Sequence, residues 1–208
     1  MKKTLFLTAL SLLAFAFLFS TCSSPKPEKT IENLKAAING ESTASAKYAA
    51  FAAKAREEGY DTIAKMFDAT SKAENIHASN HMTVLVKLGV EYSPQIDSFK
   101  VLSTQENLQA AIDGETYEST TMYPNFLKDA ETEKVMEATT SFTWAKDTEV
   151  KHMEFYKKAL ETISSSAKET GLPFSWAVCP KCGNTFAEGS IEETCSFCMT
   201  PKEKYIQF

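Results

Sequence analysis

The chain has 208 residues, 43% of them hydrophobic and 24% charged, and its formal net charge is −5 at pH 7. This length suits one mid-sized domain with a second, small one. The negative charge and the lack of a basic run beyond Lys2 and Lys3 exclude the usual features of a nucleic-acid-binding protein, so no nucleic-acid partner is expected. Between residues 30 and 170 Gly and Pro are scarce, which predicts helices.

The N-terminus has the pattern of a bacterial export signal. A short positive region precedes an apolar stretch over residues 4–19, and Cys22 follows. We assign residues 1–21 to a signal peptide and residues 22–29 to a tether.

Cys22 resembles the lipidated cysteine of a lipoprotein signal, although Phe19 and Thr21 depart from the usual residues before it. We therefore expect an exported protein, anchored by a lipid to a membrane on its periplasmic or cell-surface side. The alternatives are simple secretion and an uncleaved anchor. The apolar stretch is short for a spanning helix, which needs about 20 residues.

Four long helices are predicted over residues 30–168. The first covers residues 30–58 and the second residues 61–88, and a glycine follows each of them. After a long connection, Ser103-x-x-Glu106 resembles a capping box that opens the third helix. Apolar positions over residues 142–163 mark the fourth helix.

A carboxylate-rich segment occurs twice. Residues 32–41 read ENLKAAINGE and residues 106–115 read ENLQAAIDGE, so Glu41 and Glu115 end equivalent segments. A Glu-x-x-His motif recurs at almost the same offset, one position longer: Glu74 with His77, and Glu149 with His152. A duplicated helical hairpin of this kind carries the ligands of a di-iron carboxylate bundle.

Seven metal-binding side chains lie on the predicted inward faces: Glu41, Glu74, His77, Glu115, Glu118, Glu149 and His152. Burying five carboxylates without compensation would cost several kcal/mol for each ion. Two ferrous or ferric ions nearly balance that charge, and carboxylate and imidazole ligands suit iron or manganese. The alternative is that some of these acids are solvated, as most glutamates are. His81 has no counterpart in the second copy and is interpreted as a structural histidine.

Four cysteines form a C-x2-C-x12-C-x2-C pattern: Cys179, Cys182, Cys195 and Cys198. Four thiolates can hold one tetrahedral metal, and the spacing alone allows zinc or iron. The Cys-Pro-x-Cys-Gly sequence ending at Gly183 favours iron, whereas Ser196 and Met199 make the second half less typical. We expect a small metal-dependent domain over residues 174–208. Four aromatic side chains are expected around the metal: Trp176, Phe186, Tyr205 and Phe208.

From residue 30 to residue 208 the chain resembles the rubrerythrin family. The motifs that carry the resemblance are Gly40-Glu41-Ser42, Glu74-x-x-His77, Gly114-Glu115-x-x-Glu118, Met122-Tyr123-Pro124-x-Phe126, Glu149-x-x-His152 and the four-cysteine tail. A ferritin would lack the tail and Glu118. The resemblance implies a mainly α fold, in which a ferritin-like four-helix bundle with a long crossover between its second and third helices precedes a small rubredoxin-like β domain.

The resemblance also implies roles for the ligands of two iron ions. Glu74 and Glu149 would bridge them, Glu41 would be terminal on one iron, and Glu115 and His152 would be terminal on the other.

On the first iron, Glu118 would bind in the ferric form and His77 in the ferrous form. Tyr48 and Tyr123 match tyrosines that hydrogen-bond ligating carboxylates in the family. The alternative for both tyrosines is ordinary core packing.

The implied reaction is the reduction of hydrogen peroxide to water, with electrons relayed by the four-cysteine iron from an unidentified donor. In the family that iron commonly serves the partner subunit of a head-to-tail homodimer. The alternatives are a ferroxidase or iron-handling protein and a non-enzymatic surface metalloprotein.

Overall fold

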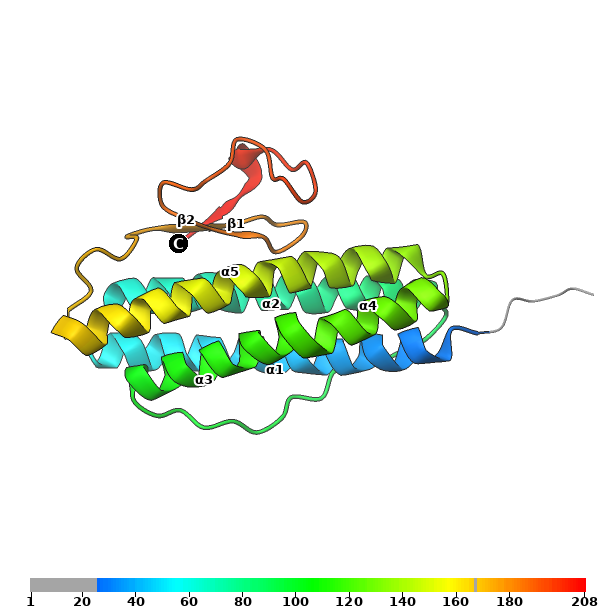
Figure 1. Cartoon of the computed structure of the whole chain (residues 1–208), viewed down its shortest axis with the longest axis horizontal. Helices are drawn as coiled ribbons and strands as arrows, with labels where there is room; N and C mark the ends of the chain where they lie inside the picture. Colours follow the sequence, from blue (N-terminus) through cyan, green and yellow to red (C-terminus); the bar gives the residue numbers. More distant parts are fainter. Residues whose placement is uncertain (1–25, 167) are drawn as a thin grey trace, which may run out of the picture.

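The structure, a computed structural model, describes residues 26–166 and 168–208; the expected signal peptide and Cys22 lie outside the described residues. It is mainly helical, as predicted (Figure 1). Its helices are α1 (Glu28–Glu57), α2 (Asp61–Lys87), α3 (Thr104–Tyr117), the π-helical turn η1 (Glu118–Met122), α4 (Tyr123–Thr132), α5 (Met136–Ser166) and the 3-10 turn η2 (Lys202–Lys204). Its strands are β1 (Trp176–Val178), β2 (Thr185–Ala187) and β3 (Ile206–Gln207). Among the described helices, none has both the length and the apolar character needed to cross a membrane.

The ferritin-like bundle is confirmed. α1, α2, α5 and the bent rod formed by α3, η1 and α4 lie side by side (Figure 1). A crossover over residues 88–103 joins α2 to α3 along the bundle. Its backbone is tied to α1, where Asn39 Oδ1 accepts from the Gln95 N–H at 2.8 Å and Thr43 Oγ1 accepts from the Asp97 N–H at 3.0 Å.

The start of α3 follows the sequence signal. The Ser103 hydroxyl accepts from the backbone N–H of Glu106, and the Glu106 carboxylate accepts from the backbone N–H of Ser103, which forms a complete capping box.

The predicted third helix is interrupted at η1. The backbone N–H of Tyr123 donates to the carbonyl of Glu118, five residues back, so this turn holds one more residue than an α-helical turn. Pro124 comes next and has no N–H to donate to the preceding turn. The helix axis continues into α4, but the side chains beyond η1 are shifted in phase.

The bundle core has two apolar clusters, one towards each end. One includes Phe51, Phe67 and Tyr156, and the other includes Leu34 and Phe142. On α1 and α5 the site glutamates fall between the residues of these two clusters, so apolar layers seal the acidic centre from both ends.

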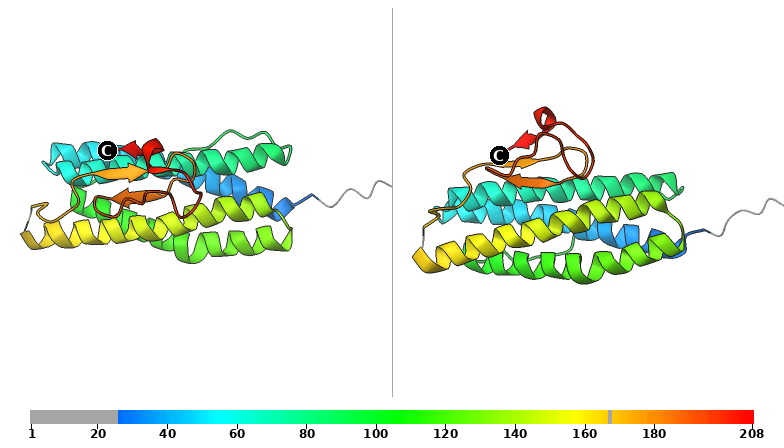
Figure 2. Two further views of the ribbon diagram at one scale, coloured as in Figure 1. Left: turned by 90° about the horizontal axis from the view of Figure 1, so that it is seen from above. Right: turned by 45° about the horizontal axis from the view of Figure 1, so that its top comes forward.

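The cysteine module, residues 174–208, is a three-stranded antiparallel sheet in the order β2-β1-β3. It lies over α2 and α5 (Figure 2). The aromatic prediction is half right. Phe186 and Tyr205 stack at 5.0 Å beside the cysteines. Trp176 instead packs on Phe155 of α5 at 4.7 Å, and Phe208 joins the same bundle cluster, because the sheet needs an apolar face against the helices.

Candidate metal centres

Six of the seven predicted bundle ligands come together in two overlapping groups. Four ligand atoms lie within 4.8 Å of one another in each group: Glu41, Glu74, His77 and Glu149 in the first, and Glu74, Glu115, Glu149 and His152 in the second. We call these six residues the dimetal site. Glu74 and Glu149 belong to both groups, which is the position of a bridging carboxylate.

The dimetal site is built for cations. All six side chains are at most 1% exposed. Within the described part of the chain, ten buried side-chain N or O atoms have no hydrogen-bond partner. Seven of them belong to this site: Glu41 Oε2, Glu74 Oε1, His77 Nε2, Glu115 Oε2, both Glu149 oxygens and His152 Nδ1. Buried polar atoms are normally paired, so a cluster of unpaired acceptors fits metal ions.

Without metal, the pKa values of three of the site residues, Glu74, Glu115 and His152, are raised, whereas that of Glu41 is lowered. Burial and the charge of Glu149 raise the pKa of Glu74 to about 7. Burial and the neighbouring carboxylates raise the pKa of Glu115 well above its usual value. Burial would lower the pKa of His152, but the charge of Glu74 and a hydrogen bond with Glu149 raise it to about 9. Burial would raise the pKa of Glu41, yet His77 and His81 hold it well below its usual range.

Both histidines turn the same ring nitrogen towards the carboxylates. His77 Nδ1 lies 2.9 Å from Glu74 Oε2 and 3.1 Å from Glu149 Oε1. His152 Nδ1 lies 3.0 Å from both Glu74 Oε1 and Glu149 Oε2. The Nε2 atoms point away from the metal positions, towards the cysteine module.

Two tyrosines donate hydrogen bonds to site carboxylates, each from one half of the internal repeat to the other half. Tyr48 on α1 donates to Glu115 Oε1 at 2.6 Å, and Tyr123, at the start of α4, donates to Glu41. Both hydroxyls are buried, and burial raises both pKa values well above 10, so the tyrosines remain donors. Tyr48 also packs in the aromatic core, against Phe67 at 5.9 Å, so it fits both sequence interpretations.

η1 explains why the offset of the repeat lengthens along the chain. The offset from Tyr48 to Tyr123 is one position longer than the offset from Glu41 to Glu115. The extra residue is absorbed by η1, which lies between Glu115 and Tyr123. The hydroxyls of Tyr48 and Tyr123 therefore reach equivalent glutamates, Glu115 and Glu41, although the two repeats differ in length by one residue.

Glu118 lies outside both groups of ligands. It is the first residue of η1 and its side chain is partly covered. Burial and the charges of Glu41 and Glu149 raise its pKa well above the usual value. Glu118 is therefore the one predicted bundle ligand that the structure does not bring into either group.

His81 proves to be part of the same network. It is fully buried, with Nδ1 at 2.7 Å from Ser141 Oγ and Nε2 at 3.0 Å from the Tyr123 hydroxyl. It lies outside both ligand groups, but the sequence interpretation did not reveal its link to Tyr123. The sequence signal that could have indicated this link is the position of His81, one helical turn after His77 on the predicted inward face.

The four cysteines meet in one cluster, with all four Sγ atoms within 4.8 Å of one another. Two similar turns deliver them: the N–H of Gly183 donates to the Cys179 carbonyl at 3.0 Å, and that of Met199 donates to the Cys195 carbonyl at 2.8 Å. Gly183 has φ +82° and Met199 φ +61°, so Met199 takes the left-handed position that glycine occupies in the first turn.

The cysteine cluster is coupled to the dimetal site through α5. Thr185 Oγ1 lies 2.9 Å from His152 Nε2. Lys151 Nζ donates to Asn184 Oδ1 at 2.6 Å, and Asn184 Nδ2 in turn points at Cys195 Sγ at 3.5 Å.

A second approach runs through α2. The Cα of Gly183 faces His77 so closely that a Cβ there would lie 2.3 Å from Nε2. The module therefore presents its first cysteine turn to both site histidines, within one chain.

The comparisons with known proteins agree with this geometry. The rubrerythrin family model matches residues 32–160. Nigerythrin of Nitratidesulfovibrio vulgaris is 37% identical over 180 residues, which are 86% of each chain. Rubrerythrin of Porphyromonas gingivalis is 32% identical and covers 86% of this chain and 90% of its own. The structure of fully reduced, all-ferrous nigerythrin has a TM-score of 0.77 and 35% identity, and covers 92% of this chain and 91% of its own. The chain therefore belongs to the rubrerythrin family, with a di-iron centre in its bundle and a single iron in its four-cysteine cluster.

Proposed function

We propose that this protein is a peroxidase that reduces hydrogen peroxide to water in defence against oxidative stress. The observation that carries the proposal is the contact between Thr185 and His152, because it joins a one-electron site to a ligand of a two-electron site. When bound, the two ferrous ions supply the electron pair that breaks the O–O bond. The cysteine module returns electrons singly from an external donor that the sequence does not identify.

The protein side chains prepare the site for that chemistry. Glu74 and Glu149, which belong to both ligand groups, would bridge the two metal ions. Tyr48 and Tyr123 orient the carboxylates of Glu115 and Glu41 by donating to them. The apolar layers at both ends keep bulk water from the centre.

In this proposal one position on the first iron alternates between two ligands. His77 would hold the iron in its ferrous form and Glu118 in its ferric form, since an anion stabilises the higher charge better than a neutral imidazole does. Glu118 begins the wide turn η1, and such turns are frequent at functional sites.

The assembly and location are also proposals. We propose a homodimer, as the family resemblance implies, and export with a lipid on Cys22, on the sequence pattern alone. Mass spectrometry of the mature N-terminal peptide tests the lipid: an unmodified peptide that retains residue 1 contradicts cleavage at Cys22 and lipidation.

Kinetics distinguish a peroxidase from a ferroxidase. The anaerobically reduced, iron-loaded protein is mixed with hydrogen peroxide or with dioxygen, and oxidation of the di-iron centre is followed by absorbance. We expect peroxide to react much faster and a chemical reductant to restore the ferrous state for repeated turnover. Preference for dioxygen, with ferric product accumulating from added ferrous ions, would favour the ferroxidase. Zinc at every site, with no redox cycle, would favour a non-enzymatic metalloprotein.

A further inference from the structure

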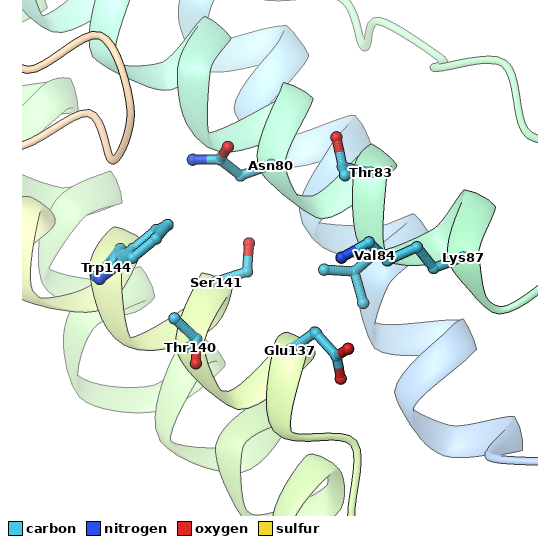
Figure 3. Close-up of a pocket in the computed structure, with 8 residues that line it drawn as sticks. All are labelled: Asn80, Thr83, Val84, Lys87, Glu137, Thr140, Ser141 and Trp144. Atoms are coloured by element: carbon cyan, nitrogen blue, oxygen red, sulfur yellow. The ribbon is translucent and has the colours of Figure 1, made fainter. Parts of the chain in front are cut away.

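A pocket of about 220 Å³ opens between α2 and α5, beside the dimetal site. Lys87 and Glu137 stand at its solvent side, and Thr140 and Ser141 line it from α5. Figure 3 shows the Ser141 hydroxyl directed into this pocket. The Ser141 side chain is itself buried, with 5% of its surface exposed, so it connects the pocket to the interior.

An unbroken series of hydrogen bonds leads inward from Ser141. Its hydroxyl lies 2.7 Å from His81 Nδ1, His81 Nε2 lies 3.0 Å from the Tyr123 hydroxyl, and that hydroxyl donates to Glu41. The directions follow from the last bond. Because the Tyr123 proton is committed to Glu41, the Tyr123 oxygen accepts, so His81 carries its proton on Nε2. Bare Nδ1 then accepts from Ser141, and every donor points towards the metal centre.

We propose that this series, Ser141 to His81 to Tyr123, delivers protons from the pocket to the Glu41 side of the di-iron centre. The inference rests on the proposed function, since reduction of one peroxide to two waters consumes two protons as well as two electrons. The electrons enter through the cysteine module, whereas these protons enter through the α2–α5 pocket.

Each transfer is balanced by its neighbour. A protonated water in the pocket gives its extra proton to Ser141 Oγ and becomes neutral water, as the Ser141 proton passes to His81 Nδ1. The Nε2 proton passes to the Tyr123 oxygen as the Tyr123 proton passes to the Glu41 carboxylate. His81 thereby exchanges one neutral tautomer for the other.

The internal repeat strengthens the inference, because its second copy lacks this route. His81 stands one helical turn after His77, and the residue one turn after His152 is Tyr156. The Tyr156 hydroxyl donates to Thr70 Oγ1 at 2.6 Å, and Thr70 is fully buried and donates to the Phe67 carbonyl at 3.2 Å. That branch ends inside the core, whereas the His81 branch reaches the pocket.

The first test needs no turnover. The chain has only three histidines, so 15N-histidine NMR of the zinc-loaded, diamagnetic protein resolves the His81 ring, assigned by its loss in His81→Gln. We expect the proton on His81 Nε2 to exchange rapidly with solvent in the wild type and in Thr140→Ala, and to lose that rapid exchange in Ser141→Ala. Thr140 is the matched control because it lines the same pocket but bonds the Met136 carbonyl of its own helix.

The second test follows oxidation of the reduced, iron-loaded protein by peroxide. Ser141→Ala should slow it roughly a hundredfold, the lower end of what a positioned proton donor contributes. Ser141→Thr, which keeps the hydroxyl, should retain most of the rate. Equal iron content in all variants excludes a folding effect.

The outcomes separate this inference from the proposed function. Unchanged His81 exchange and an unchanged peroxide rate in Ser141→Ala overturn the proton route and leave the peroxidase intact. If Ser141→Ala slows the His81 exchange but the wild-type protein does not react with peroxide, the proton route is supported and the peroxidase proposal is overturned. A His81 proton found on Nδ1 instead of Nε2 also overturns the route.

Discussion

Thr185 Oγ1 of the cysteine module lies 2.9 Å from Nε2 of His152, whose other nitrogen, Nδ1, faces the carboxylates of the dimetal site. One imidazole is therefore shared between the two metal sites. A hydrogen bond to the outer nitrogen of a ligating histidine fixes its tautomer and orientation, so Thr185 both positions the ligand and connects the sites.

Thr185→Val should keep both irons but slow electron transfer between them, because valine has the shape of threonine without the hydroxyl. The measurement is stopped-flow reduction: the four-cysteine iron is reduced first, and reduction of the di-iron centre then lags behind the wild type. Thr162→Val is the matched control, since Thr162 lies on α5 and bonds only its own helix, at the Lys158 carbonyl. Equal rates in both variants would remove Thr185 from the route.

Gly183→Ala should separate the module from the bundle. Its Cβ would lie 2.3 Å from His77 Nε2 and 3.2 Å from the Ala73 carbonyl oxygen, and backbone cannot yield as a flexible side chain does. Gly189→Ala is the control, because Gly189 has φ +81° but nothing within 4 Å of its Cβ.

Both substitutions carry the backbone cost of a left-handed alanine, about 1–2 kcal/mol. Small-angle scattering should show a larger radius of gyration for Gly183→Ala only. A compact Gly183→Ala protein with normal electron transfer would contradict the docking seen here.

Mixing two inactive variants tests whether electrons pass within one chain. Cys195→Ser removes the four-cysteine iron, and Glu149→Ala removes the di-iron centre. Because Thr185 and His152 meet within one chain, we expect mixed dimers, formed by unfolding and refolding the two variants together, to stay inactive. Recovery of peroxidase activity in the mixture would mean that the module docks on the partner subunit.

Glu149→Ala should empty the dimetal site while the red iron–thiolate absorption remains. Glu149 belongs to both ligand groups, so its loss removes a ligand from each metal position. Metal analysis and optical spectra provide the measurement. The control is Glu154→Ala on the same helix, whose carboxylate is exposed. Loss of both iron signals in Glu149→Ala would mean that the two sites do not fold independently.

The metal-free protein should become less stable as pH rises from about 5 to about 9. The folded state raises the pKa of Glu74 from 4.5 to about 7 and that of His152 from 6.5 to about 9, so in this range it binds more protons than the unfolded chain. The stability that Glu74 contributes is lost as pH rises from 4.5 to about 7, and the stability that His152 contributes is lost as pH rises from 6.5 to about 9. Glu41 has the opposite sign, but its contribution is lost only as pH falls below 4.5.

Thermal unfolding of metal-free protein across this range checks the slope. The iron-loaded protein should not lose stability in this way, because the metal ions replace the protons on Glu74 and His152. A metal-free melting temperature that rises with pH would contradict the pKa directions.

The bundle and its ligands could be predicted because their signals are local. Glu-x-x-His places both side chains on one helix face, and the repeat supplies the second half of the site. η1 was missed because a π turn changes the phase by one residue without changing composition. The lengthening of the repeat offset was its only trace.

His81 is a structural histidine outside both ligand groups, as predicted, but its hydrogen-bond partners could not be predicted. Its partner Ser141 is 60 residues away and on another helix, so no spacing rule connects them. The prediction that Trp176 packs around the cysteines was wrong, because the sequence of a small sheet does not indicate which of its faces contacts a neighbouring domain.

The π turn at Glu118–Met122 also sets how this helix can change in evolution. Successive residues of an α-helix are about 100° apart around its axis. Removing one residue from the turn would restore the regular α-helical phase, yet it would rotate Tyr123 away from Glu41 and break both the carboxylate support and the path from His81. A shorter relative with an unbroken helix here would need a different donor for that glutamate.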